Sequence, residues 1–256
     1  MKKKMHDHDR KRVRVVSLSV DVVTLESVIE RCVKLSDKGG GYVCFSTVHM
    51  VMEGHDDASF ARIVNSADIV VPDGMPLVWV QKRTGRREAE RVRANDLMTE
   101  LCLYAEANGR SVGFYGAAPE VIDDIKKRIE REMPNLKVAY AYSPPYRALT
   151  DEEDSEVTDE INRTKPDFLF VGLGCPKQER WMNAHRDRLS TVSLGVGASF
   201  DFFAGNVREC PPWIGRLGLE WLYRLTQEPK RLWRRYLILN PRFMALAAKQ
   251  LIGGRK

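Results

Sequence analysis

The sequence contains no uninterrupted apolar run of the roughly 18 residues that a membrane-spanning helix needs. Its basic first segment is followed by RVRVVSLSVDVV, whose alternation with charged residues is typical of a strand and not of the apolar centre of a signal peptide. Internal repeats and low-complexity tracts are also absent from the sequence. We therefore expect a globular protein that is not integral to a membrane.

Cysteine is scarce and unpatterned. The five cysteines form no CxxC pair and no zinc-site spacing, and they lie mostly in apolar or helical contexts: Cys32, Cys44, Cys102, Cys175 and Cys210. We interpret them as reduced core residues of a cytosolic protein. A nucleophilic pair of Cys175 with His49 or His185 stays open, but no flanking signature supports it.

Metal-binding motifs are equally sparse. Asp7-His8-Asp9 resembles the short acidic motif by which many glycosyltransferases hold a divalent metal, but it lies in a basic arm. We therefore predict neither a metal site nor a cofactor.

Positive charge is concentrated at the two ends of the chain. The formal net charge is +6, and residues 208–256 carry eleven basic side chains against three glutamates. Such charge favours an anionic partner, whether a membrane, a nucleic acid or a diphosphate. We predict a basic, disordered arm over residues 1–12, an α/β catalytic core over residues 13–207, and a basic amphipathic helical appendage over residues 208–256. Pro229 and Asn240-Pro241 should divide this appendage into three short helices.

Strand-like runs alternate with helical patterns along the core, which predicts an α/β, Rossmann-like fold. Its sheet should be largely parallel and flanked by helices, with the C-terminal helical appendage added to it. Thr150 and Glu153 have the spacing of a capping box, and a helix over 26–36 should stop at Gly39-Gly40. The predicted strands are Val13–Val20, Tyr42–Thr47, Asp68–Pro72, Ser111–Tyr115, Leu136–Ala141, Asp167–Gly172 and Val192–Val196.

Ligands of an open α/β sheet bind at the carboxyl ends of its strands, so polar residues and glycines just after each apolar run are candidate site residues. The richest segment is 167–181, where an apolar strand meets glycines, a proline and a helix start whose amides suit a phosphate. An ordinary β-to-α turn is the structural alternative there, and a turn in Pro72-Asp73-Gly74 is another. The positions selected in this way are Thr47, His49, Asp73, Gly116, Gly172, Gly174, Gln178 and Asp201.

Several ordered motifs resemble those of the WecG/TagA/CpsF glycosyltransferases (glycosyltransferase family 26), over about residues 14 to 245. Ser143-Pro-Pro-Tyr-Arg147 looks like the subset of that family that acts in exopolysaccharide assembly. The motifs are Thr47 with His49, Pro72-Asp73-Gly74, Glu90 to Met98, Gly172 to Glu179, Gly195 to Asp201, Ala204-Gly205, Gly218 to Arg224 and Glu228-Pro229.

The resemblance implies an inverting, metal-independent enzyme of bacterial cell-surface polysaccharide synthesis. It would move a sugar from a UDP-sugar to a polyprenyl-diphosphate-linked saccharide. A carboxylate must take the acceptor proton, and Asp73 is the candidate general base. Arg91 would stabilise the leaving diphosphate and Thr47 would position a substrate. The chain has His49 where the family usually has asparagine and Ala94 where it usually has glycine, and both substitutions could change the donor or acceptor sugar. His49 could share proton transfer with Asp73, and the alternative is a neutral hydrogen-bonding replacement for asparagine.

The remaining binding roles also follow from the resemblance. Gln178 would hold the diphosphate or sugar, Asp201 the ribose hydroxyls, and Tyr146 would stack on uracil. Gly116, Gly172, Gly174 and Pro176 would shape the substrate-binding loops. The appendage would supply cations for phosphate or membrane: Arg224, Arg231, Arg234 and Arg235.

The appendage itself predicts membrane contact. On an α-helical wheel the basic side chains of residues 230–235 fall on one arc and the apolar and aromatic ones of residues 232–239 on the other. Such a helix can lie on an anionic bilayer, so we expect a cytoplasmic protein at the inner face of the cell membrane. The alternative is a helix packed on its own core or in a subunit interface. Away from the membrane its apolar surface would favour a homo-oligomer.

Two functions from other classes remain as alternatives. An NAD-dependent oxidoreductase would use Gly172 and Gly174, but the third glycine of the fingerprint is missing, Pro176 interrupts the loop and the motif lies late in the chain. A basic nucleic-acid-binding module would explain the charged ends, but no nucleic-acid motif is evident, and we expect no nucleic-acid partner.

Overall fold

The structure is a computed structural model that describes residues 11–211, 214 and 220–253. The predicted basic arm, with Asp7-His8-Asp9, therefore lies almost wholly outside the described residues. In the part of the chain that is described, no helix combines the length and hydropathy that crossing a bilayer requires.

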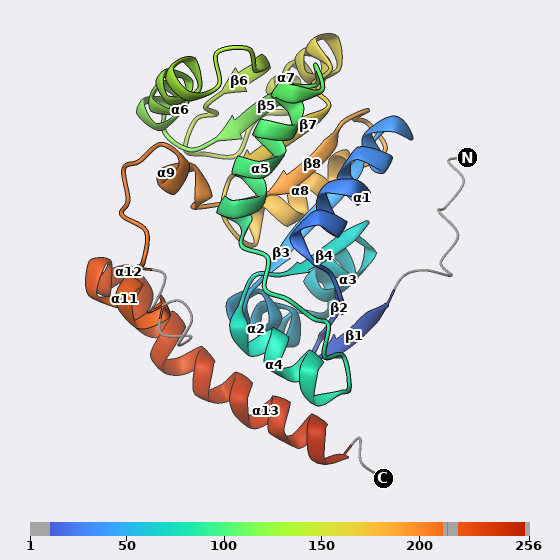
Figure 1. The fold of residues 1–256 in the computed structure, drawn as a ribbon, viewed down its shortest axis with the longest axis vertical. Coiled ribbons are helices and arrows are strands. Elements are labelled where there is room, and N and C mark those ends of the chain that lie inside the picture. Colours follow the sequence, from blue (N-terminus) through green and yellow to red (C-terminus); the bar gives the residue numbers. More distant parts are fainter. Residues whose placement is uncertain (1–10, 212–213, 215–219, 254–256) are drawn as a thin grey trace.

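A six-stranded parallel sheet forms the centre of the protein (Figure 1), with strand order β4-β3-β8-β7-β5-β6. Because every pairing is parallel, the carboxyl ends of all six strands meet at one edge, where ligands of such sheets bind. The predicted α/β class is confirmed. The strands are β3 (Gly41–Ser46), β4 (Ile69–Pro72), β5 (Ser111–Gly116), β6 (Lys137–Tyr142), β7 (Phe168–Gly172) and β8 (Val192–Gly195).

Helices cover both faces of the sheet, so its central strands are buried on both sides. This explains their continuous apolar sequences, since a strand that is buried on both faces has no polar face. One face packs against α1 (Leu25–Asp37), α5 (Ala94–Ala107), α6 (Pro119–Glu132) and α9 (Ser199–Phe203). The other packs against α2 (Val48–Asp56), α3 (Ala58–Ser66), α4 (Met75–Arg83), α7 (Asp151–Thr164) and α8 (Lys177–His185).

The first predicted strand, Val13–Val20, is wrong as a strand of the sheet. The segment forms a separate antiparallel hairpin of β1 (Arg12–Val15) and β2 (Leu18–Asp21), with Val16 at φ 56° in the turn. The buried Asp21 accepts the Val70 amide of β4 at 2.7 Å, so the hairpin covers the outer edge of the sheet without extending it.

Both predicted helix boundaries are confirmed. Thr150 and Glu153 form a reciprocal capping box at the start of α7. Helix α1 ends at Asp37, and Gly39 and Gly40 follow with φ of 91° and 105°, which glycine adopts without the penalty of a Cβ.

The described part of the C-terminal segment is helical and runs along one side of the protein (Figure 1). It comprises α11 (Glu220–Gln227), α12 (Pro229–Arg234), a π-helical stretch η2 (Arg235–Leu239) and α13 (Asn240–Gly253). Phe243 and Ala247 of α13 are buried in the core, and Arg242 forms an ion pair with Asp56 of α2. This helix therefore packs on the α/β core.

Two details of the predicted appendage are wrong. Pro229 does separate two helices, but Asn240-Pro241 does not: Asn240 has helical dihedrals, and η2 passes directly into α13. From Arg235 onward the segment is π-helical, so the spacing of an α-helical wheel does not describe it. Leu232 of α12 is buried and Leu237 of the π-helical stretch is exposed, although the wheel placed both on one arc.

Candidate active site

The ends of β3 and β4 bring Thr47 and Asp73 together. The amides of Asp73 and Gly74 both donate to the Ser46 carbonyl of β3, at 3.0 and 3.3 Å. Thr47 is the N-cap of α2, and its hydroxyl accepts the Met50 amide. A sharp turn after each strand thus points both residues toward one cleft.

Residues of the core and of the C-terminal segment line this cleft jointly. Six of the predicted site residues meet there, namely Thr47, His49, Asp73, Arg91, Arg224 and Arg235. The remaining wall is largely apolar and aromatic, with Val48, Met75, Pro76, Trp221 and Tyr236. The cleft therefore combines cations, one carboxylate from the core and an apolar surface.

Arg91 contacts Asp73 through both its backbone and its carboxylate. Its Nε donates to the Asp73 backbone carbonyl at 2.6 Å, and its Nη2 lies 3.8 Å from the Asp73 carboxylate. Burial raises the pKa of Asp73 above its ordinary value, although the positive charge of Arg91 opposes the rise. A carboxylate with a raised pKa is a better proton acceptor than an ordinary aspartate.

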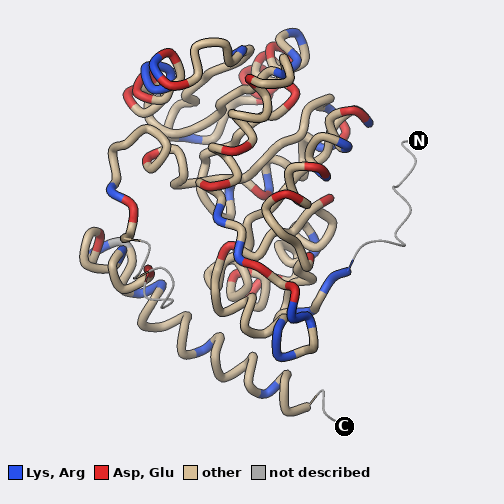
Figure 2. The backbone as a smooth tube through the Cα atoms, in the orientation of Figure 1, with Lys and Arg blue, Asp and Glu red and all other residues tan. Residues whose placement is uncertain are grey.

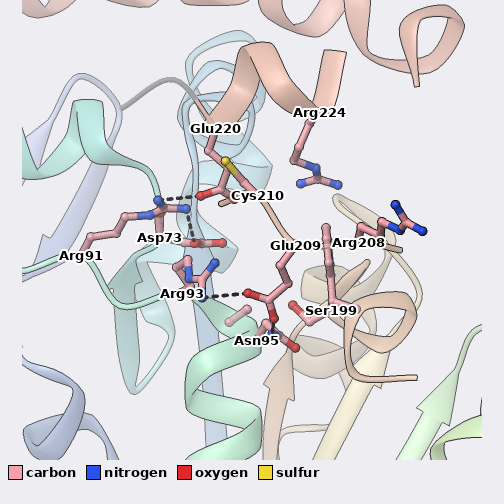
Figure 3. Close-up of a pocket in the computed structure, with 12 residues that line it drawn as sticks. Asp73, Arg91, Arg93, Asn95, Ser199, Arg208, Glu209, Cys210, Glu220 and Arg224 are labelled. Atoms are coloured by element: carbon pink, nitrogen blue, oxygen red, sulfur yellow. Dashed lines mark hydrogen bonds and ion pairs between the residues drawn. The ribbon is translucent and has the colours of Figure 1, made fainter. Parts of the chain in front are cut away.

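Carboxylates of the C-terminal segment form ion pairs with Arg91 and Arg93 of the core (Figure 3). Arg91 Nη1 pairs with Glu220 of α11 at 2.8 Å. Arg93 pairs with Glu209 at 3.1 Å and with Asp96, in the first turn of α5, at 2.7 Å. These pairs fix α11 and the segment before it against the core.

The arginines predicted from the appendage are placed differently from one another. Arg235 donates to the Thr47 hydroxyl at 3.2 Å, and Arg224 lies over the Phe202 ring and lines the cleft. Arg234 is exposed and lies 6.0 Å from the Trp233 ring centroid, outside the cleft. The Arg231 side chain lies outside the described residues.

His49 lies on the first turn of α2 and lines the cleft. Its Nε2 is 3.3 Å from Glu53, while its buried Nδ1 has no hydrogen-bond partner among the described residues. Burial and the charge of Arg235 lower the pKa of His49 to about 4. The imidazole is therefore neutral at pH 7, as expected for a hydrogen-bonding replacement of asparagine.

The glycines at positions 116 and 172 have a packing reason to be glycine. A Cβ on Gly116 would lie 2.6 Å from the Gly172 carbonyl carbon, and a Cβ on Gly172 would lie 2.7 Å from the Phe200 ring. Gly174, at φ 78°, has no atom within 4 Å of such a Cβ and follows β7 in a more open loop, before the cis bond between Cys175 and Pro176. A substrate-binding role for these loop residues stays a prediction.

Gln178 lies behind that loop and is 4 % exposed. Its Oε1 accepts the Gly174 amide at 3.1 Å, and its Nε2 donates to the Gly195 carbonyl and to Glu179, both at 2.8 Å. In this arrangement the amide side chain joins the ends of β7 and β8. The predicted contact of Gln178 with substrate stays untested.

Two further predicted residues lie apart from the cleft. Tyr146 is fully exposed beside Lys177, which lies 5.2 Å from the centre of its ring. Asp201 lies on α9, whose neighbouring residues Ser199 and Phe202 line the pocket around Arg93. Their predicted contacts with uracil and ribose therefore stay predictions.

Comparison with known proteins gives the family. The model of the glycosyl transferase WecG/TagA/CpsF family matches residues 13–256. The chain belongs to this family. It is therefore a glycosyltransferase, and this replaces both alternative functions.

Three curated relatives are similar over most of the chain, and all carry the name N-acetylglucosaminyldiphosphoundecaprenol N-acetyl-beta-D-mannosaminyltransferase. The one from Bacillus spizizenii is 34% identical over 84% of this chain and 81% of its own length. One from Bacillus subtilis is 35% identical over 76% of this chain and 73% of its own length. One from Staphylococcus aureus is 34% identical over 75% of this chain and 73% of its own length.

The WecG/TagA/CpsF site contains residues that the sequence prediction missed. Glu220, Trp221 and Tyr236 line the cleft, and Arg93 and Glu209 line the adjoining pocket. Glu220 and Trp221 belong to the motif Gly218 to Arg224, so the resemblance held a signal for them. No motif marks Glu209, whose partners come from a distant part of the chain.

Proposed function

We propose that this glycosyltransferase moves N-acetylmannosamine from its UDP-sugar to N-acetylglucosaminyl-diphosphoundecaprenol. The printed names of the three relatives support both the sugar and the lipid-linked acceptor. An inverting displacement on an α-linked nucleotide sugar gives the β linkage in those names. The exopolysaccharide subset suggested by Ser143–Arg147 stays a prediction.

The observation that carries this proposal is the Asp73 carboxylate in a cleft formed by core and appendage. As the acceptor hydroxyl oxygen bonds to C1 of the donor sugar, the bond from C1 to UDP breaks and UDP leaves with the electron pair. The hydroxyl proton passes to Asp73. Thr47, beside Asp73 in the cleft, is suited to orient one of the two sugars.

Arginines supply the charge that a departing diphosphate needs. Arg91, Arg224 and Arg235 line the cleft, and Arg93 lies in the adjoining pocket. Guanidinium groups bind phosphate oxygens in bidentate geometry, and the partly buried site strengthens the interaction. We therefore propose that these side chains stabilise UDP as it leaves, without a required metal.

The proposed place of action is the inner face of the cell membrane, with the C-terminal helices on an anionic surface. Large apolar side chains are exposed along these helices, with Leu237 at 57 % and Ile252 at 73 %. Acidic residues are absent from residues 229–253, and Figure 2 shows the positions of basic residues along α13. Apolar and basic side chains together favour an interfacial helix. Since residues of these helices line the cleft, membrane binding through them would bring the cleft close to a lipid-linked acceptor.

Asp73→Asn tests this function. We expect the variant to bind UDP as the wild type does, since the diphosphate contacts remain, and to transfer sugar about 100-fold more slowly, the usual scale for loss of a general base. Calorimetry would measure binding, and a product assay with the lipid-linked acceptor would measure transfer. The control is Asp124→Asn, a surface carboxylate of α6 that pairs with Lys127. Wild-type transfer by Asp73→Asn would remove Asp73 from this role.

A further inference from the structure

The guanidinium group of Arg91 is shared unequally between two carboxylates. Its Nη1 is 2.8 Å from Glu220, a hydrogen-bonding distance, whereas its Nη2 is 3.8 Å from Asp73. Its Nε is occupied by the Asp73 backbone carbonyl. The tight ion pair of Arg91 is therefore with the appendage, although Asp73 is its neighbour in the core (Figure 3).

This division leaves the Asp73 carboxylate with only the longer ion pair to Arg91, at 3.8 Å. Among the described residues, no hydrogen bond to its side chain is present, and its nearest cation is the one at 3.8 Å. A close bidentate pair with arginine would stabilise the ionised carboxylate and make it a weaker base. It would also occupy the oxygens that must accept the proton of the acceptor.

We propose that Glu220 is a positioning residue that holds Arg91 away from the Asp73 carboxylate, so that docking of α11 keeps the general base free. The inference rests on the proposed role of Asp73 as the base. It gives the appendage a part in the chemical step itself, besides contacts with phosphate and membrane.

The charges around Asp73 agree with this geometry. Arg91 and Arg93 face it from the segment before α5, and Glu220 and Arg224 face it from α11. Arg235 of η2 and the neutral His49 of α2 line the same cleft. Burial raises the pKa of Asp73, Arg91 lowers it, and the negative charge of Glu220 raises it.

Glu220 is itself ionised at neutral pH. Burial acts to raise its pKa, but its hydrogen bond with Arg91 and the charges of Arg91, Arg93 and Arg224 lower the pKa below the ordinary value. Glu220→Gln removes this charge and releases Arg91 toward Asp73. Both effects lower the pKa of Asp73.

The test is the pH dependence of kcat/KM with UDP-N-acetylmannosamine and the detergent-dispersed lipid acceptor. For Glu220→Gln we expect the acidic limb to move to lower pH by about one unit, and kcat above that limb to fall about tenfold, because Asp73 becomes a weaker and partly blocked base. UDP affinity should stay within about twofold, because the released Arg91 still faces the cleft. Glu220→Asp, which keeps the charge, should restore part of the rate.

Asp56→Asn is the matched control, since Asp56 also forms an ion pair between the core and the C-terminal helices, with Arg242, but neither residue lines the cleft. It should leave the acidic limb unchanged. An unmoved limb in Glu220→Gln, or a loss confined to UDP binding, would overturn the inference.

If Asp73→Asn were fully active, the base assignment itself would be wrong. An inactive Asp73→Asn beside an unaltered Glu220→Gln would reject only the role of Glu220. If Glu220→Gln fails to fold, Glu220→Asp is measured instead: an acidic limb that moves by less than one unit, with a kcat between the wild-type value and a tenfold loss, supports the role of Glu220, and a wild-type limb with wild-type kcat contradicts it.

Discussion

Replacing Glu179 with glutamine should make the stability of the fold less sensitive to pH. Glu179 is fully buried beneath the loop after β7, where it accepts a hydrogen bond from Gln178. Burial raises its pKa from 4.5 to about 7, although hydrogen bonds partly oppose the rise. Folding thus favours the protonated carboxyl group.

The sign and size of the effect follow from linkage. Because the folded pKa exceeds the unfolded one, stability is highest below pH 4.5, falls as the pH rises toward 7, and is constant above that. One pKa unit corresponds to about 1.36 kcal/mol, so the whole loss is about 3 kcal/mol. Glu179→Gln cannot ionise and should escape this loss.

Urea denaturation from pH 5 to pH 8 would measure the difference. We expect Glu179→Gln to be more stable than wild type by up to about 3 kcal/mol at pH 8, with the advantage shrinking steadily toward pH 5. Glu100→Gln, an exposed glutamate of α5, is the control and should change little. A stability difference that does not vary with pH would refute the reasoning.

Two further predictions concern the loops and the appendage. Gly116→Ala should lower the free energy of unfolding by more than about 1 kcal/mol, since φ is 123° and the new Cβ would meet the backbone of Gly172. Gly174→Ala should lower it by only about 1 kcal/mol, from φ strain alone, and equal losses of the two variants in thermal unfolding would contradict this. Arg235→Ala should weaken UDP binding and lower kcat/KM by at least about tenfold, because one guanidinium group is lost from the cleft. Arg242→Ala should change neither quantity, because its partner Asp56 lies outside the cleft. Similar effects of the two changes on calorimetric UDP binding and on kcat/KM would argue against a role for Arg235.

Local patterns predicted the core well, because each is decided by neighbouring residues. The apolar sequence of β7 needs burial on both faces, and only the centre of an α/β sheet provides it. The polar residues after β3 and β4, Thr47 and Asp73, lie together because parallel strands end at one edge. Capping by Thr150 likewise depends on one turn of helix.

Contacts between distant segments could not be predicted in the same way. The alternation in Val13–Val20 predicts a strand but not its partner, and Val16 turns the chain back on itself. Nothing local distinguishes a Gln178 that faces substrate from one that joins two strand ends. No local pattern marks the π-helical stretch that begins at Arg235, nor the hydrogen bond from that side chain to Thr47, which is 188 residues away in the sequence.

The most direct test of the proposed function is a transfer assay in excess EDTA with UDP-N-acetylmannosamine and N-acetylglucosaminyl-diphosphoundecaprenol, run on wild type and on Asp73→Asn. Our account predicts a β-linked disaccharide on the lipid with wild type, at a rate that chelation does not change, and about 100-fold less with the variant. Absence of product from a wild type that still binds UDP, or equal rates for the two proteins, would contradict it.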